Sequence, residues 1–370
     1  MSNPPGDARP PLTIAAILGR LAAIGLILAC VAGAFAYVGG WFSPNRLTPD
    51  RVLAALQEDG RMHPGFRRNH AKGVCATGWF DSNGQAASLS RAAVFHTGRI
   101  PVVARFSLAG SLPFQPDTAA QIRAMALRIM PPGAEEWRTA MVDLPVFVAD
   151  TVEAFYALLE NAAPDSKTGK PDPAKMQAFF AGYPSSARAL GIVGHRAISS
   201  GFGDATYNGL DAFRFIGPTG AETAVRWSFV PAAPAASGTA APAKPDDKNY
   251  LFDSLIAQVA AHPLQWHMIV TVGQPGDATA DPTMAWPADR RTIDAGTLTI
   301  DHLSAEADGA CEAVVFDPLV LPDGIAPSDD PIPSARSAAY ARSFRLRAGE
   351  AAEKPASAVT PQEIAAGEKS

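Results

Sequence analysis

A long uncharged segment near the N-terminus constrains this chain more than any other feature. No residue from Leu21 to Asn45 carries a charge. At a rise of ~1.5 Å per residue, Leu21–Trp41 would span roughly 31 Å as a helix, which is about one hydrocarbon core of a bilayer. Arg9 and Arg20 precede this segment, and aromatic residues typical of a membrane interface lie at its end, namely Tyr37, Trp41 and Phe42. The sequence therefore predicts an N-terminal tail and transmembrane anchor over residues 1–45.

A cleaved signal peptide is the alternative for this segment, because Ala34-Phe35-Ala36 resembles a small-residue cleavage site. The apolar run is longer than the usual signal-peptide core, which favours an anchor that stays attached. Arg46 and Arg51 follow the run about as closely as basic residues precede it, so the charge asymmetry is small. We expect a single-pass protein of the cell inner membrane, with its bulk on the periplasmic or exported side.

The composition allows a sizeable core and excludes some partners. Hydrophobic residues make up 47% of the 370 residues and charged residues 18%, and the net charge of −5 offers no basic stripe for nucleic acid. With 31 Gly and 33 Pro, the chain should contain many turns and irregular connections. Three cysteines cannot form a disulfide framework, although Cys75 and Cys311 could pair in an oxidising compartment.

Residues 46–350 predict one globular domain of the α+β class. A short helix is expected at Thr48–Leu56, and further helices at Val152–Asn161, Lys175–Ala181, Ser185–Ser199, Leu251–Ala261 and Ser334–Phe344. Strands are expected at Val74–Phe80, Ile100–Leu108, Ile122–Met130, Val142–Val148, Asp211–Phe215, Val225–Val230, Met268–Val272, Gly296–Ile300 and Glu312–Phe316. Because strands come first and no period repeats, this order favours an antiparallel β-barrel or strongly curved sheet with surrounding helices.

Two segments of the chain are low in complexity. Pro231–Pro245 reads PAAPAASGTAAPAKP and predicts a loop insertion, and residues 351–370 predict a disordered tail rich in Pro, Ala and Glu. We expect neither to carry chemistry.

The first candidate site is the segment RRNHAKG, Arg67 to Gly73. Cations beside His70 disfavour its protonated form, so the imidazole would be neutral near pH 7 and could act as a base. Taken alone, a histidine in such a basic segment is more often a surface or capping residue.

The second candidate is PVVARFSLAG, Pro101 to Gly110. Strand alternation places Val103, Arg105 and Ser107 on one face. If that face is buried, the Arg105 guanidinium needs an anion, and a ligand carboxylate or phosphate would serve. An edge strand with a solvated arginine is the alternative.

The third candidate is PIPSARSAAYARSFRLR, Pro331 to Arg347. Arg336 and Tyr340 are four residues apart and share a helix face, and Arg347 lies near that face if the helix continues. A guanidinium beside a phenol stabilises the phenolate, which is a known axial ligand of haem iron. The alternative is a core tyrosine with a surface arginine.

These three segments, in this order, resemble the haem catalase superfamily, and in particular its short, membrane-anchored catalase-related peroxidases. The resemblance covers roughly Leu47 to Arg347, and it includes DLPVFVADTVEAF as the wall of the haem pocket and DPTMAWP as a family segment. It implies a catalase-like barrel that binds haem b (iron), since the chain has no CxxCH attachment motif.

The resemblance also implies a role for individual residues. His70 matches the catalytic distal histidine, Ser107 the residue that orients it, and Tyr340 the axial iron ligand with Arg336 as its charge partner. The remaining cofactor-binding residues are the propionate-binding Arg67, Arg105 and Arg347 and the aromatic residues near the distal face and access channel, Phe147 and Phe155.

One departure from the large catalases affects the expected activity. The segment Val142-Asp143-Leu144-Pro145 lacks the distal amide of those enzymes. The loss should weaken dismutation more than O–O cleavage. The resemblance therefore implies a peroxidase that reduces hydrogen peroxide, and small organic peroxides, through an oxoferryl intermediate, with a small organic reductant as electron donor and a homodimer as the assembly. A dehydratase of fatty-acid hydroperoxides and a non-enzymatic, membrane-tethered haem-binding protein are the alternatives.

Overall fold

The computed structural model describes residues 13–39, 41, 46–57, 62–165, 167–233, 247–350 and 357–367. The chain divides into two units, Met1–Thr48 and Pro49–Ser370. Arg9, Phe42 and most of the predicted loop insertion, residues 234–245, lie outside the described residues.

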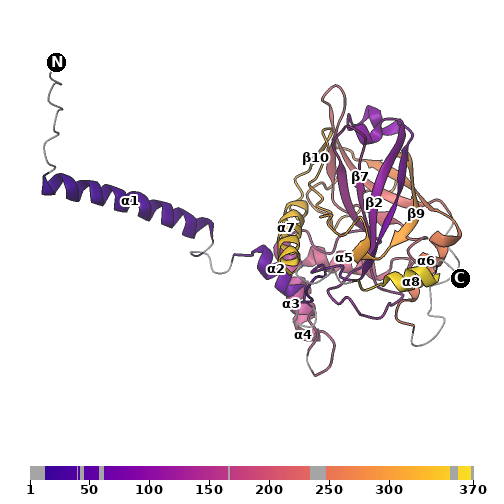
Figure 1. Ribbon diagram of the computed structural model, residues 1–370, viewed down its shortest axis with the longest axis horizontal. Coiled ribbons are helices and arrows are strands. Elements are labelled where there is room, and N and C mark those ends of the chain that lie inside the picture. The colour runs from indigo at the N-terminus through magenta and orange to yellow at the C-terminus, as the bar shows by residue number, and fades with distance from the viewer. Residues whose placement is uncertain are drawn as a thin grey trace, which may run out of the picture. The chain divides into compact units, whose positions relative to one another are not determined.

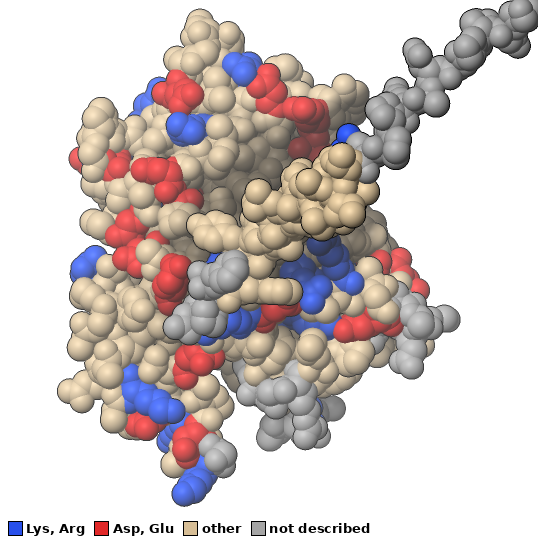
Figure 2. Space-filling view, turned by 90° about the vertical axis from the view of Figure 1, so that its left-hand side faces the viewer, with Lys and Arg blue, Asp and Glu red and all other residues tan. Residues whose placement is uncertain are grey.

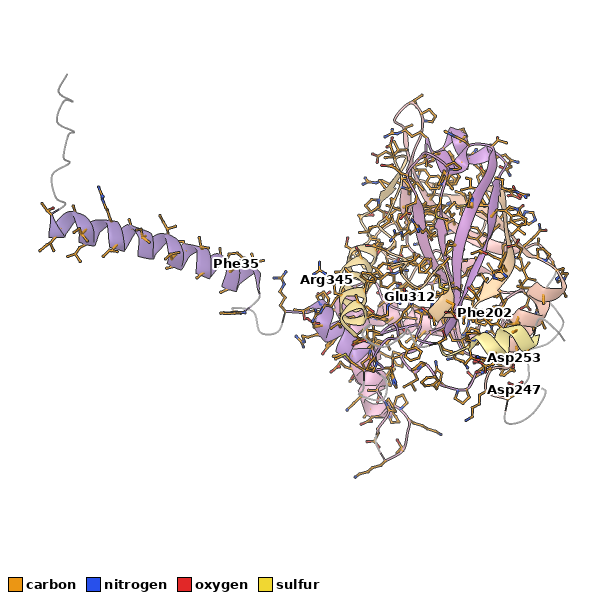
Figure 3. The ribbon with its side chains drawn as sticks, viewed as in Figure 1. Phe35, Phe202, Asp247, Asp253, Glu312 and Arg345 are labelled. Atoms are coloured by element: carbon orange, nitrogen blue, oxygen red, sulfur yellow. A yellow bond between two sulfur atoms is a disulfide. The ribbon has the colours of Figure 1, made fainter. Side chains whose placement is uncertain are left out.

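The N-terminal unit contains one helix, α1, at Ile14–Val38 (Figure 1). It begins earlier than the uncharged run, because the Thr13 side chain caps it by accepting the amide of Ala16, and it ends before Trp41. Its mean hydropathy is 2.4 and none of its described side chains is buried, as Phe35 illustrates (Figure 3). The helix is long and apolar enough to cross a membrane.

The second unit is built on a closed antiparallel β-barrel (Figure 1). The strands follow the order β10-β6-β7-β5-β4-β3-β2-β1-β9-β8, and the additional pairing of β7 with β8 closes the eight strands from β7 to β8 into a barrel. The strands are β1 (Gly73–Ser82), β2 (Gly98–Leu108), β3 (Arg123–Ile129), β4 (Trp137–Val142), β5 (Tyr207–Asn208), β6 (Phe213–Ile216), β7 (Glu222–Pro231), β8 (Leu264–Val272), β9 (Thr292–Ser304) and β10 (Ile325–Pro327). The predicted class and barrel are thus confirmed.

Strand alternation divides the barrel wall into a core face and an outer face. On β2, Ala104 and Phe106 point into the main apolar core, whereas Val103 belongs to a separate cluster outside it. Inside the barrel, Phe106 packs against Trp266 and against Phe202, which lies at the end of the barrel nearest α6 (Figure 3). The core is therefore filled by side chains and leaves the outer face for a site.

Helices surround the barrel. They are α2 (Pro49–Ala55), α3 (Val152–Ala162), α4 (Pro173–Gly182), α5 (Pro184–Gly194), α6 (Tyr250–Ala261), α7 (Ile332–Glu350) and α8 (Pro361–Gly367), with 3₁₀ turns η1 (Gln85–Ser88), η2 (Ala93–Phe95) and η3 (Glu306–Asp308). The predicted helices are present with shifted ends. Helix α7 continues past Phe344 to Glu350, which keeps Arg347 on the helix.

Two predicted strands are wrong. Val142–Val148 is a loop after its first residue, because Pro145 cannot donate to a ladder and Asp143 instead accepts the amide of Arg123. The residues that pair with β3 are those of β4, which ends at Val142, the first residue of the predicted strand. Glu312–Phe316 forms no strand, because main-chain carbonyls in this segment accept hydrogen bonds from arginine side chains.

The C-terminal segment also differs from the expected disordered tail. Helix α8 contacts α6, and Val359 and Ile364 are buried in the main core. The Ser357 hydroxyl accepts the amide of Ala307 at 2.8 Å. This part of the tail therefore belongs to the folded domain.

Gly78 in β1 should be required for the barrel wall. A Cβ at this position would lie 1.9 Å from the carbonyl oxygen of Thr299 on β9, beside an irregularity in the β1–β9 register. We expect Gly78→Ala to lower the thermal midpoint by destabilising the fold by roughly 1–3 kcal/mol. Gly191→Ala in α5 is the control, since that position has open space and alanine favours a helix. Equal midpoints for both variants in a thermal melt would contradict this expectation.

Candidate active site on the outer wall of the barrel

His70 occupies a backbone conformation that is uncommon for a residue with a side chain. Its φ is 54°, and the Oδ1 atom of Asn69 accepts the amide of His70 at 2.9 Å and that of Gly110 at 3.1 Å. Ser107 Oγ lies 3.4 Å from His70 Nδ1. The imidazole is thereby oriented through Nδ1, which leaves Nε2 available.

His70 is neutral at physiological pH. Burial, together with the charges of Arg105, Arg336 and Arg67, lowers its pKa to about 3. The predicted neutral state therefore agrees with the structure, but two of the expected causes do not contribute. Arg68 instead pairs with Glu350, and Lys72 with Asp117, each away from the ring.

Three arginines form a buried cluster with two glutamates on the outer wall. Arg67 Nε lies 2.8 Å from Glu306 Oε1, and Arg105 Nη2 lies 2.8 Å from Glu306 Oε2. Arg347 Nη1 lies 3.2 Å from Glu312 Oε1. We call these five residues the guanidinium cluster. On the side of the domain that carries α2 and α7, Lys and Arg side chains gather in a recess with carboxylates beside them (Figure 2).

The guanidinium cluster retains positive charge. Burial alone would raise the pKa of Glu306, but Arg105 and Arg67 lower it to about 2, so this carboxylate is ionised. Burial and the charge of Arg67 lower the pKa of Arg347 to about 10, which keeps it cationic at pH 7. Three cations against two carboxylates leave one formal positive charge, which suits an anionic group.

Gly73 explains how Arg105 reaches this cluster. A Cβ on Gly73 would lie 2.6 Å from the Cζ atom of Arg105. The guanidinium therefore passes over the glycine, and its Nη2 atom donates to the carbonyl of His70 at 2.8 Å. Gly73, the final residue of RRNHAKG, is thus needed so that Arg105 can pack against this segment. This contact joins the first candidate segment to the second.

The third segment places Arg336 beside Tyr340 on α7. The Arg336 guanidinium lies 5.8 Å from the Tyr340 ring centroid. Its other partners are Asp211 Oδ2 at 2.7 Å and the carbonyl of Ala140 at 2.9 Å. Burial would lower the pKa of Arg336, but Tyr340 and Asp211 raise it, so a permanent cation faces the phenol.

Two buried carboxyls lie behind Arg336. Asp211 and Asp330 interact through their side chains, and neither Asp211 Oδ1 nor Asp330 Oδ2 has a donor from another described residue. Burial and the neighbouring Asp211 raise the pKa of Asp330 to about 7. With a pKa near 7, the pair therefore holds one proton at pH values below neutrality.

The barrel wall between Arg105 and Arg336 carries small side chains. Residues that are opposite one another on β2, β3 and β4 form a row across the wall: Arg105 pairs with Ala126, and Ala126 pairs with Ala140. The carbonyl of Ala140 accepts a hydrogen bond from Arg336. Both alanines are partly exposed. A neutral histidine, a phenol beside a cation, and a cluster of guanidinium groups are the donors that haem requires. The residues present therefore fit this cofactor.

Phe147 and Phe155 lie together, as the sequence predicts for two residues of one pocket. Their ring centroids are 5.5 Å apart, and Phe155 projects from α3. Their proposed place near the access channel stays a prediction.

Sequence reasoning missed several residues of this site. Asn69 could have been noticed as a side chain that can accept main-chain amides immediately before the histidine. Glu306 and Asp211 gave no signal, because each lies far in sequence from the arginines it binds. Their roles depend on the barrel.

The described fold and site define a class: closed antiparallel barrels with a histidine outside the barrel and a tyrosine–arginine pair on a helix that packs against it. The sequence matches the Catalase family over residues 54–359, and the chain belongs to this family.

Individual relatives agree. A catalase-related peroxidase of Synechococcus elongatus is 40% identical over 83% of this chain and 90% of its own length, and one of Mycolicibacterium paratuberculosis is 32% identical over 82% and 96%. A bacterial catalase structure has the same fold, with a TM-score of 0.67 at 22% identity over 82% of this chain and 62% of that chain.

The acid pair should make stability depend on pH in a predictable direction. An acid whose pKa is about 7 in the folded state and near 4 when unfolded binds its proton more tightly in the folded state. Its contribution is thus greatest at low pH and is lost as pH rises from about 4 to 7, by up to ~1.4 kcal/mol per pH unit. We expect Asp330→Asn to gain thermal stability relative to the parent between pH 5 and pH 8.

The exposed Asp301→Asn serves as the control for this series of thermal melts. A difference between Asp330→Asn and the parent that stays constant with pH would show that the pair does not share a proton.

Proposed function

We propose that this protein is a haem peroxidase that reduces hydrogen peroxide, and small organic peroxides, with a small organic electron donor. The observation that carries the proposal is a neutral His70 whose pKa is lowered by burial and by the charges of Arg105, Arg336 and Arg67, together with the pairing of Arg336 and Tyr340 on α7. Family membership and the similar length of two catalase-related peroxidases support it.

The site residues would divide the binding of haem b among them. Tyr340 would ligate the iron, with Arg336 stabilising its phenolate, and the arginines of the guanidinium cluster would receive the propionates. Phe147 and Phe155 would line the distal face and access channel. When bound, haem supplies the redox chemistry by which the O–O bond is cleaved.

The protein's own contribution is the movement of one proton. His70 Nε2 takes a proton from one oxygen of the peroxide and returns it to the other oxygen, which leaves as water. Ser107 holds Nδ1, and the low pKa of His70 keeps the base unprotonated before each turnover. The absence of an amide in Val142–Pro145 supports at most weak catalase activity.

We further propose that α1 anchors the protein in the inner membrane with the catalytic domain exported. The length and mean hydropathy of α1 support an anchor. The Cys75–Cys311 disulfide supports an oxidising compartment.

Substitutions at the two sides of the site test the proposed activity. His70→Ala should lower peroxide-dependent oxidation of a dye donor by about 10²–10⁴-fold while haem content is retained, because the proton acceptor is lost. Tyr340→Phe should instead lower haem content and change the Soret band. Parent-like activity in His70→Ala, or a parent-like spectrum in Tyr340→Phe, would contradict the assigned roles. Turnover of a fatty-acid hydroperoxide faster than hydrogen peroxide would indicate a dehydratase, and haem-loaded protein without activity a binding protein.

Membrane attachment has a separate test. We expect the full chain to stay in the membrane pellet after alkaline carbonate extraction and to be digested by protease added to spheroplasts. Release of a shortened chain into the periplasm would indicate a cleaved signal peptide.

A further inference from the structure

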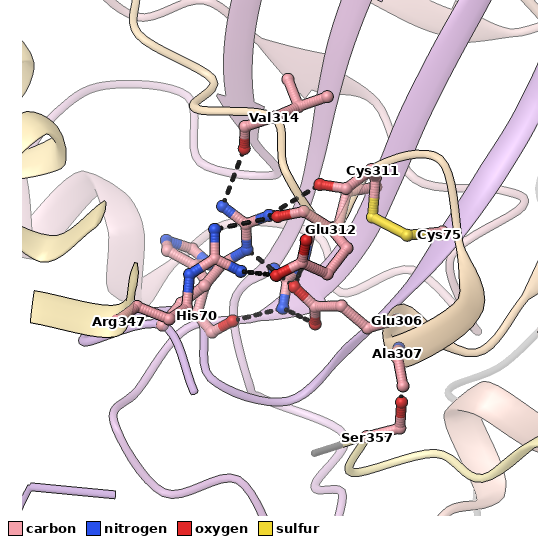
Figure 4. Close-up of a disulfide and its surroundings, with 11 residues drawn as sticks. His70, Cys75, Glu306, Ala307, Cys311, Glu312, Val314, Arg347 and Ser357 are labelled. Carbon is pink, nitrogen blue, oxygen red and sulfur yellow. Dashed lines mark hydrogen bonds and ion pairs between the residues drawn. A yellow bond between two sulfur atoms is a disulfide. The ribbon is translucent and has the colours of Figure 1, made fainter. Parts of the chain in front are cut away.

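A disulfide lies beside the guanidinium cluster and not in the main core. Cys75 on β1 is bonded to Cys311, 236 residues later, and both are fully buried (Figure 4). Val74 and Ala76, which flank Cys75, point into the barrel core, so strand alternation turns Cys75 to the outer face. There it pairs in register with Arg105. The disulfide therefore joins the wall that carries Arg105 to the segment that follows η3.

That segment, Cys311–Val314, provides acceptors for two arginines. Arg67 donates to the carbonyls of Cys311 at 2.9 Å, Val314 at 3.1 Å and Glu312 at 3.3 Å. Arg347 donates to the carbonyl of Glu312 at 2.9 Å. Because these acceptors belong to the main chain, the position of the backbone decides where both guanidinium groups lie (Figure 4).

Regular secondary structure does not hold this backbone in place. The segment lies outside any helix or strand, and its described main-chain hydrogen bonds to other main-chain groups are those of turns, such as that from Val314 to Cys311. Gly309 packs directly on the disulfide, since a Cβ there would lie 2.4 Å from Cys75 Sγ. The disulfide is thus the covalent link between the segment and the barrel.

We propose that the Cys75–Cys311 disulfide is a positioning element for the guanidinium cluster, and that its formation sets how tightly the carboxylate edge of haem is held. The inference rests on the proposed function, in which this cluster receives the propionates. Formation of the bond removes two protons and two electrons from two thiols, and one hydrogen peroxide accepts them to give two waters. Thiol–disulfide exchange with a dithiol reverses it.

The test compares two haems that differ only at the propionates. Affinities of protohaem and of haem dimethyl ester, which lacks the carboxylate charges, are measured by Soret titration of the full chain in detergent. The parent should prefer protohaem. In Cys75→Ser/Cys311→Ser, protohaem affinity should fall by about tenfold or more, as when outer supports of a ligand site are removed, while ester affinity should stay the same. The matched control is Cys30→Ser, because Cys30 is the remaining cysteine and lies exposed on α1.

A second variant keeps the test valid if the serine pair folds poorly. Cys75→Ala/Cys311→Val retains apolar side chains in the cluster around the disulfide and should show the same selective loss. A general weakening of the fold would lower both affinities equally, and that result would overturn the inference, as would a variant that keeps the parent's preference. A parent chain that binds both haems equally would instead overturn the propionate assignment, and the inference with it.

Discussion

The site depends on one buried carboxylate. Glu306 accepts hydrogen bonds from Arg67 and Arg105, which come from the approach to β1 and from β2. Without Glu306, like-charged guanidinium groups would lie together in a buried place, at a cost that only solvent or another anion could offset. Burial is the main cause of the lowered pKa of His70, and these two cations, with Arg336, lower it further. A single glutamate thus permits the concentration of positive charge that sets the chemistry of the base.

Backbone strain is confined to the two sides of the site. Among the described residues, only His70 and Leu210 are non-glycine residues with positive φ. The first is the proposed base, and the second precedes Asp211, which binds Arg336. Each strained residue is held by its surroundings, His70 through Asn69. The stability of the barrel therefore compensates for the strain of these two residues, which orient side chains of the site.

Much of this arrangement could be predicted from the sequence, because alternation and helical spacing are local rules. Arg105 and Ser107 share a face as expected, and so do Arg336 and Tyr340. Contacts between segments could not be predicted. Glu306 lies 201 residues from Arg105, and Asp211 lies 125 residues from Arg336. The apolar pattern of Glu312–Phe316 predicted a strand. The sequence does not show that main-chain carbonyls of this segment accept hydrogen bonds from arginine side chains.

Closure of the barrel has a consequence for biogenesis. β1 pairs with β9 as well as with β2, and β7 pairs with β8, so the wall closes only when residues near 300 are present. Contacts of such long sequence separation form late and slowly. The tyrosine follows later still, on α7. A nascent chain that has not yet reached α7 thus lacks part of the candidate site, so under the proposed function haem would bind only after α7 has been synthesised.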